Sequence, residues 1–245
     1  MHTWVIADRF SIYVFFSLKM YIMKVFVVHY KKLVDRKQSI LDQFEKHNIT
    51  DYEFIEIDRD EIEDSELTIF QEEHLSKGKI AVLLSHFYAY KQISENYDNG
   101  LIFEDDAILD DNFPELLNTY MNQLPEDYDL LFIGDGNNLH ISNDRIVPEQ
   151  YIYEKSIFTT ECDGYGAARF SDSYIVNKKC AIELCDHINT FPELINVTID
   201  WWINVASNTK NFKVYWAEPT IVMQGSKNGI FVSSLNNNNI LPPPP

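Results

Sequence analysis

The chain has 245 residues, of which 45% are hydrophobic and 14% aromatic, a composition that supports a packed core and excludes a disordered protein. Aspartate and glutamate total 38 against 20 lysines and arginines, and the formal net charge of −18 argues against a nucleic-acid-binding surface, which needs clustered positive charge. The cysteines Cys162, Cys180 and Cys185 are too few and too irregularly spaced for a disulfide framework or a zinc site, so we expect reduced thiols and a cytoplasmic protein.

The N-terminus is apolar over residues 10–23, but Lys19 interrupts the run and Asp8 and Arg9 precede it. This stretch is short for a membrane helix, and no small-residue cleavage site follows it. We therefore expect residues 1–22 to be an extension, with a signal or membrane anchor as the alternative.

The opposite end, residues 236–245, is rich in asparagine and proline and predicts a disordered tail. A single folded domain is expected over residues 23–235.

This domain opens with a strand, a helix and a second strand. Residues 24–30 form a continuous apolar run, typical of a strand that is buried on both faces. A helix with one apolar face is predicted over residues 35–47, and residues 52–57 alternate as a second strand. A long helix is predicted over residues 79–97 from its apolar residues at helical spacing. The pattern indicates a βαβ unit and an α/β fold.

An apolar strand then delivers three consecutive carboxylates, Glu104, Asp105 and Asp106, to one point. Adjacent carboxylates repel one another when ionised, so such a cluster at a buried strand end favours a divalent cation. About one run of three acids is expected by chance at this composition, so the run alone is weak evidence for a site. Its neighbours make it informative, because a strand precedes it and a second strand is predicted over residues 129–133. Acids at the carboxyl ends of strands in an open α/β sheet lie where ligands bind.

The remaining elements continue the α/β pattern. They are a helix over residues 112–121, a strand over 151–158, a strand over 173–176, a helix over 178–187 and a helix that begins near Thr198. No dinucleotide-binding glycine motif, Walker loop or esterase elbow occurs, which removes the usual signs of redox, NTPase and esterase chemistry.

The order of these segments resembles glycosyltransferase family 25, which includes bacterial lipooligosaccharide galactosyltransferases and collagen hydroxylysine galactosyltransferases. The resemblance is carried by residues 24–36, 76–86, 102–107, 164–176 and 199–202. It implies a GT-A type fold, a Rossmann-like α/β sheet that binds a nucleotide sugar. It also implies inverting transfer of galactose or glucose from a UDP-sugar to a glycan, a lipid-linked sugar or a hydroxylysine, with Mn²⁺ or Mg²⁺ as cofactor.

The resemblance assigns roles to individual residues. Glu104, Asp105 and Asp106 match the acidic metal motif. The donor contacts that it implies are Tyr30, as a stacking surface, Arg36, as a diphosphate contact, and Lys79, Ser85 and His86. Arg36 and His86 also have plainer explanations, as a surface helix residue and as a hydrogen-bonded structural histidine. Lys79 stands where many family members carry an acid, which leaves the donor sugar open.

Inversion requires a base that takes the proton of the acceptor hydroxyl. Asp200 is the candidate, with Asp163 and Glu161 in reserve. The alternative for Asp200 is that it caps the helix or interacts with its dipole.

Acceptor contacts are expected from Asp163, Tyr165 and Trp201. Trp201 and Trp202 point about 100° apart on a helix, so we expect one of them to belong to the core. Two rival functions use the same features, namely a metal-dependent hydrolase and a noncatalytic interaction protein of the same fold.

Overall fold

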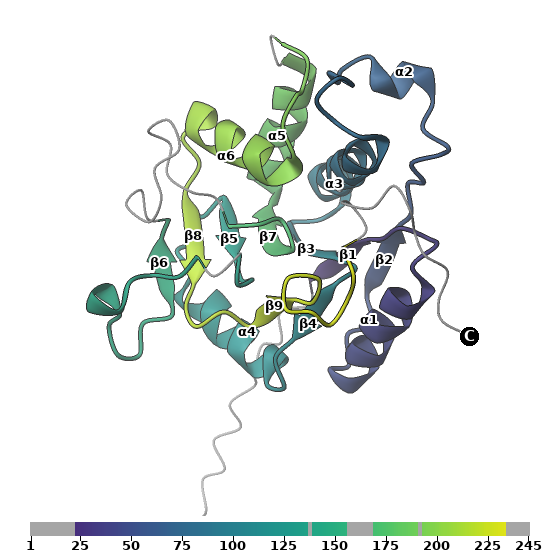
Figure 1. Ribbon diagram of the computed structural model, residues 1–245. Coiled ribbons are helices and arrows are strands. Elements are labelled where there is room, and N and C mark those ends of the chain that lie inside the picture. Colours follow the sequence, from purple (N-terminus) through teal and green to yellow (C-terminus); the bar gives the residue numbers. More distant parts are fainter. Residues whose placement is uncertain (1–22, 137–138, 156–168, 191–192, 234–245) are drawn as a thin grey trace, which may run out of the picture.

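The computed structural model describes residues 23–136, 139–155, 169–190 and 193–233. These residues form a seven-stranded sheet in the order β2-β1-β3-β7-β5-β8-β6, shown in Figure 1. The strands are β1 (Lys24–Val28), β2 (Tyr52–Ile55), β3 (Asn99–Glu104), β5 (Leu130–Phe132), β6 (Ile152–Glu154), β7 (Ser173–Asn177) and β8 (Val214–Ala217).

The carboxyl ends of three neighbouring strands meet at one edge of this sheet. β1 pairs in parallel with both β2 and β3, and Val28 lies opposite Ile55 on one side and Glu104 on the other. β7 is antiparallel to β3 and to β5, so it begins at this same edge, where Ser173 pairs with Phe103. The acidic run is therefore surrounded by strand ends from separate parts of the chain.

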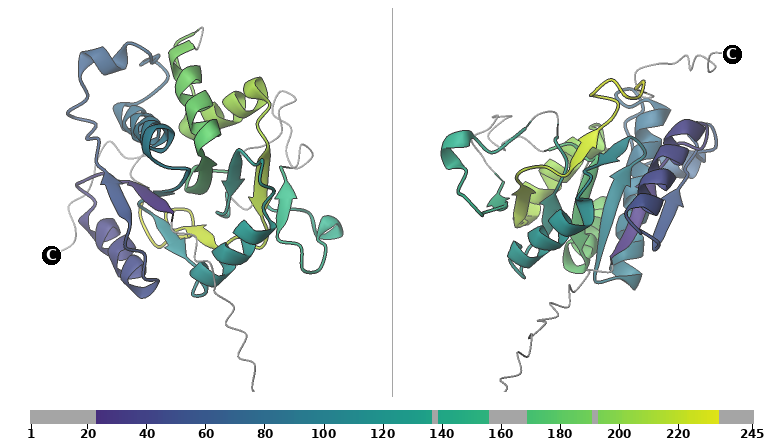
Figure 2. Two further views of the ribbon diagram at one scale, coloured as in Figure 1. Left: turned by 180° about the vertical axis from the view of Figure 1, so that it is seen from behind. Right: turned by 90° about the horizontal axis from the view of Figure 1, so that it is seen from below.

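Helices cover both faces of the sheet, as the two further views in Figure 2 also show. On one face lie α1 (Val34–Lys46) and α4 (Phe113–Gln123), and on the other lie α3 (Lys77–Asn96), α5 (Lys178–Thr190) and α6 (Ile199–Lys210). A single turn, α2 (Asp64–Leu67), precedes α3. Each helical layer encloses its own apolar cluster against the sheet. The Rossmann-like α/β architecture expected from the sequence is confirmed.

The start of α3 is fixed by a cap, and the middle of this helix packs against α6. The Ser76 side chain accepts a hydrogen bond from the Lys79 backbone N–H, which satisfies one of the free donors of the first turn. Further along α3, the Phe87 ring lies 4.8 Å from that of Trp202 in α6. Trp202 is completely buried, so this contact anchors α6 to α3.

A second, two-stranded sheet brings the end of the described chain back to the acidic run. β4 (Ala107–Leu109) pairs antiparallel with β9 (Val222–Gln224), with Ala107 opposite Gln224. The Gly225 N–H then donates to the Asp106 carbonyl at 2.7 Å.

Two expectations about the termini stay predictions. Residues 1–22 and 236–245 lie outside the described residues, so the structure does not test an extension or a tail. Among the helices of the described residues, we find none with the length and apolarity needed to cross a bilayer.

Candidate active site

A pocket of about 290 Å³ opens at the edge where β1, β2 and β3 end. Its lining includes the ends of these strands and the loops after them, Arg36 of α1, the first halves of α3 and α6, two residues before β7, and the C-terminal segment, defined here as residues 224–233. This is the position at which open α/β sheets bind ligands. Eight residues singled out in the sequence line the pocket: Tyr30, Arg36, Lys79, Ser85, Glu104, Asp105, Asp106 and Asp200.

The central acid of the run is already bound to groups of β1 and α1. Asp105 Oδ1 lies 2.6 Å from Arg36 Nη1, and Oδ2 lies 2.9 Å from His29 Nδ1 and accepts from the Tyr30 backbone N–H at 3.2 Å. The Asp105, His29 and Arg36 side chains are buried. Charge-assisted hydrogen bonds are among the strong ones, so Asp105 is well placed to hold β1 and α1 together.

Arg36 is held in the same way from the other side. Its Nη2 donates to the Val232 carbonyl at 2.7 Å, and its guanidinium lies 5.4 Å from the centre of the Phe231 ring. Arg36 therefore joins Asp105 to the C-terminal segment. The sequence suggested a diphosphate contact for this residue, but the guanidinium is already occupied by these partners.

Glu104 and Asp106 make no hydrogen bond to a cationic side chain among the described residues, and Arg36 Nη1 lies 3.8 Å from Asp106 Oδ2. Asp106 is 3% exposed, and its Oδ1 has no hydrogen-bond partner among the described residues. Burial, and then the charge of Glu104, raise the pKa of Asp106 to about 6, although a hydrogen bond from Ser226 opposes this. Glu104 accepts from the Ser171 hydroxyl at 2.6 Å. Two crowded carboxylates of this kind would be relieved by a cation.

His86 lies behind Glu104 and is not among the residues that line the pocket. Its Nδ1 is 2.7 Å from the Tyr174 hydroxyl, which also bonds Tyr90, and its Nε2 is 3.7 Å from Glu104 Oε1. The His86, Tyr174 and Tyr90 side chains are completely buried. Of the two explanations for His86, the geometry favours the structural one, in which it supports Glu104.

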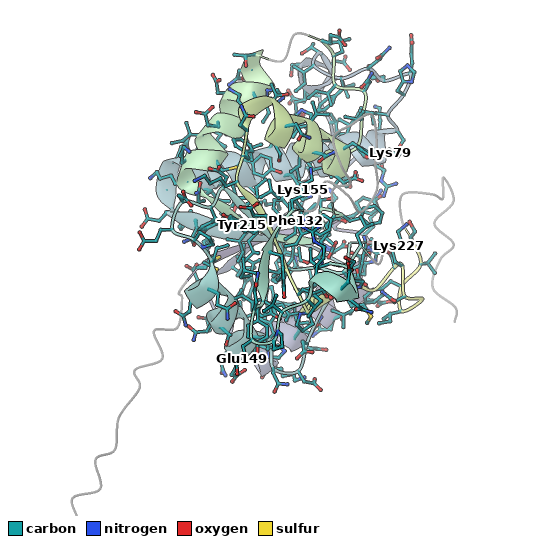
Figure 3. All side chains as sticks on the ribbon, turned by 90° about the vertical axis from the view of Figure 1, so that its left-hand side faces the viewer. Lys79, Phe132, Glu149, Lys155, Tyr215 and Lys227 are labelled. Atoms are coloured by element: carbon teal, nitrogen blue, oxygen red, sulfur yellow. The ribbon has the colours of Figure 1, made fainter. Side chains whose placement is uncertain are left out.

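Three cations line the pocket without an acidic partner in the described part of the chain: Arg59, Lys79 and Lys227. Figure 3 shows Lys79 and Lys227 on the same side of the molecule. Lys79 belongs to the first turn of α3, and the N-termini of α3 and α6 both contribute residues to the pocket. Helix N-termini carry partial positive charge and favour anions. The pocket thus combines acids with positive groups suited to phosphate.

Asp200 lies in the first turn of α6 and lines the pocket. Thr198 occupies the N-cap position, and no side-chain hydrogen bond caps this helix. The capping explanation for Asp200 therefore does not apply, while an interaction with the helix dipole remains compatible with its position.

The acids fit a metal ion that is shared with a substrate. Within the described residues, no three His, Cys, Asp or Glu side chains are grouped to hold a metal ion. Glu104 and Asp106 nevertheless offer two carboxylates, and Asp106 Oδ1 is a buried acceptor without a hydrogen-bond partner in the described part of the chain. Magnesium typically binds proteins through one or two carboxylates together with substrate phosphates. The donor set thus suits an ion that binds with a diphosphate.

A known family covers most of this architecture. Residues 22–203 match the family model described as glycosyltransferase family 25 (LPS biosynthesis protein). The chain belongs to glycosyltransferase family 25. The match runs from β1 into α6 and includes both the acidic run and Asp200, so the resemblance seen in the sequence is confirmed.

This family 25 chain is similar in sequence to a viral protein, and two solved structures resemble it at low identity. It is 29% identical over 140 residues to a protein of Acanthamoeba polyphaga mimivirus that is provisionally named a glycosyltransferase, covering 54% of this chain and 42% of the relative. The chain thus spans less than half of that protein. A mutant of Drosophila β1,4-galactosyltransferase 7 in complex with manganese, UDP-Gal and xylobiose has a TM-score of 0.41 and 11% identity, covering 80% of this chain and 65% of that chain. An active-site mutant of LgtC has a TM-score of 0.42 and 11% identity, covering 79% and 72%.

The expected acceptor contacts of the family 25 chain are only partly described. Trp201 is 38% exposed, whereas Trp202 is completely buried, as expected for one of two adjacent helical tryptophans. Asp163, Tyr165 and the reserve base Glu161 lie outside the described residues.

Sequence reasoning missed Arg59, Ser226 and Lys227. The sequence does contain an indication that Arg59 lies in the site. Arg59 follows the second predicted strand, and the carboxyl ends of parallel strands meet at one edge of the sheet, where ligands bind. Ser226 and Lys227 reach the pocket only because β9 pairs with β4, a contact between distant segments that no local pattern indicates.

We expect Asp106 to make the stability of the metal-free protein depend on pH. Its pKa in the folded state is about 6, above the roughly 3.9 of an unfolded aspartate. Between these values the folded protein holds the extra proton, so the free energy of unfolding falls as pH rises. The loss is on the order of 2 to 3 kcal/mol and is nearly complete by about pH 7, roughly one unit above the folded pKa.

Urea unfolding of the wild type and of Asp106→Asn between pH 4 and pH 7 measures this effect. The difference between the two proteins isolates Asp106 from other acids, and a difference that does not vary with pH would contradict the prediction.

Proposed function

We propose that this family 25 chain is a metal-dependent, inverting glycosyltransferase that moves galactose or glucose from a UDP-sugar to an acceptor hydroxyl. The observation that carries the proposal is one pocket lined both by two crowded carboxylates, Glu104 and Asp106, and by Lys79 and Lys227, which have no acidic partner among the described residues. A nucleotide-sugar diphosphate needs both, since lysines bind phosphate directly and carboxylates bind an ion that bridges to it.

The metal and donor roles follow from this division. Mn²⁺ or Mg²⁺ would be held by Glu104 and Asp106 together with the donor, and would neutralise charge on the departing UDP. Asp105 has a different role in this proposal, since it anchors β1 and α1 through His29 and Arg36. Lys79 and the N-terminus of α3 contact the diphosphate, and Ser85 of the same helix also lines the pocket.

Asp200 is the proposed base. The acceptor oxygen bonds to the anomeric carbon as the bond from that carbon to the UDP oxygen breaks. The electron pair of the broken bond leaves with UDP, and the acceptor proton passes to the Asp200 carboxylate. General base catalysis of this kind contributes roughly 10²- to 10⁴-fold. Attack from the face opposite to UDP inverts the anomeric centre.

The acceptor is proposed to be a glycan, a lipid-linked sugar or a hydroxylated protein. Trp201 offers an exposed aromatic face next to Asp200, and sugars pack on such faces. Asp163 and Tyr165 remain candidates for the same role. A net charge of −18 supports the absence of a nucleic-acid partner.

The test follows UDP release from UDP-galactose and UDP-glucose with Mn²⁺, in the presence and absence of candidate acceptors. Release that requires an acceptor, with a new glycoside of inverted configuration by NMR, is the expected result. Equal release into water would support the metal-dependent hydrolase instead. Calorimetry in which neither UDP nor the UDP-sugars bind with Mn²⁺ would support the noncatalytic interaction protein.

A further inference from the structure

One arginine of the pocket has no role in the proposed mechanism. The Arg59 guanidinium carbon lies 4.1 Å from the centre of the Tyr30 ring, and both residues line the pocket. Arg59 Nε is buried and has no hydrogen-bond partner among the described residues. Such a group is costly to bury unless something binds it.

The acids beside Arg59 are occupied by other cations. Asp58 lies 3.2 Å from Lys31 Nζ, and Asp60 lies 2.8 Å from Lys32 Nζ. These ion pairs join the loop after β1 to the loop after β2. They hold Arg59 against Tyr30 and leave its own charge without an acidic partner in the described part of the chain.

Arg59 lies at the far end of the pocket from the acids. β2 and β3 flank β1 on opposite sides, so their ends are two strand spacings apart, or roughly 10 Å. A nucleoside diphosphate with its phosphates at Glu104 and Asp106 would place its base toward β2. Ile57, which follows β2, lines the pocket together with the apolar side chains Val28 and Val82, and apolar walls suit a base.

We propose that the guanidinium plane of Arg59 stacks on the nucleobase of the donor and that Tyr30 positions Arg59 from behind. The inference rests on the proposed function, because it assumes a nucleotide donor. A guanidinium is planar, delocalised and weakly hydrated, and it stacks on ring faces in ways that lysine does not. The Tyr30 ring, which the sequence suggested as the stacking surface, is itself covered by Arg59 and lies 5.5 Å from Lys32 Nζ.

The deciding variant is Arg59→Lys, which keeps the positive charge and removes the planar guanidinium group. The full chain is titrated calorimetrically with uridine, UDP and pyrophosphate in the presence of Mn²⁺. We expect the affinities for uridine and UDP to fall by roughly 5- to 150-fold, the range of base stacking, and that for pyrophosphate to stay unchanged.

Two further sets of variants separate stacking from charge. Tyr30→Ala removes the support and should weaken uridine binding as Arg59→Lys does, whereas Tyr30→Phe should not. Lys227→Met is the matched control, because it removes another cation of the same pocket that has no acidic partner among the described residues, and it should leave uridine binding unchanged. A loss of uridine binding in Lys227→Met as large as in Arg59→Lys would overturn the inference.

The remaining outcomes distinguish this inference from the proposed function. If the wild type binds UDP and Arg59→Lys binds uridine and UDP as tightly, the inference alone fails. It also fails alone if Arg59→Lys lowers the affinities for UDP and pyrophosphate together and leaves the affinity for uridine unchanged, because Arg59 then contacts the diphosphate. If the wild type binds neither uridine nor UDP, the proposed function fails and the inference fails with it.

Discussion

Replacing Asp106 with asparagine is expected to lower the rate of Mn²⁺-dependent transfer by at least about 100-fold. Loss of a residue that only orients a metal ligand lowers activity by up to about 100-fold, and loss of the ligand itself should lower it by no less. The amide keeps the shape of the side chain, but it removes the negative charge that a hard cation requires. The fold should survive, since burial and the charge of Glu104 already disfavour ionised Asp106. Turnover and calorimetric UDP binding, each with and without Mn²⁺, measure the effect.

Asp135→Asn is the matched control for this prediction. Asp135 follows β5 at the same sheet edge and bonds Asn228, but it is not among the residues that line the pocket. The control should keep Mn²⁺-dependent UDP binding. Equal losses in the two variants would mean that the overall negative potential matters, and would count against coordination by Asp106.

Asp200→Asn is expected to lower kcat by roughly 10²- to 10⁴-fold while the affinity for UDP stays unchanged, because a base acts on the acceptor and not on the nucleotide. The variant should also lose about 0.3 to 1 kcal/mol of stability, since a negative charge leaves the first turn of α6. Steady-state kinetics, calorimetry with UDP and thermal unfolding separate these effects.

Glu115→Gln supplies the control for the dipole effect. Glu115 is an exposed acid in the first turn of α4, away from the pocket, so its loss should affect stability alone. If Asp200→Asn kept wild-type kcat, the base would have to be sought at Glu161 or Asp163.

The elements with strong local signals could be predicted from the sequence. A continuous apolar run predicted a strand over residues 24–30, and β1 spans Lys24–Val28. Apolar residues at helical spacing predicted a helix over residues 79–97, and α3 spans Lys77–Asn96. The acids were correctly placed at a strand end because β3 is bounded by the change from apolar to charged residues.

Elements defined by distant partners were not predicted. β8 is a short buried segment, and β4 and β9 exist as strands only because they pair with each other. For the same reason the sequence treated the three acids as equivalent. Asp105 differs from its neighbours because His29 and Arg36 reach it from positions far earlier in the chain. No local sequence pattern indicates which of three consecutive acids contacts α1.

The return of the chain along β8 and β9 determines where a recombinant version of this protein should end. The family match stops at residue 203, yet β8 occupies an interior place between β5 and β6. A polypeptide cut at that limit would lose β8, with which the edge strand β6 pairs, and would strip Arg36 of the Val232 carbonyl and Asp106 of Ser226. Recombinant boundaries chosen from family alignments alone would therefore be expected to yield insoluble material, whereas versions that extend through residue 233 retain the pocket contacts of the described residues.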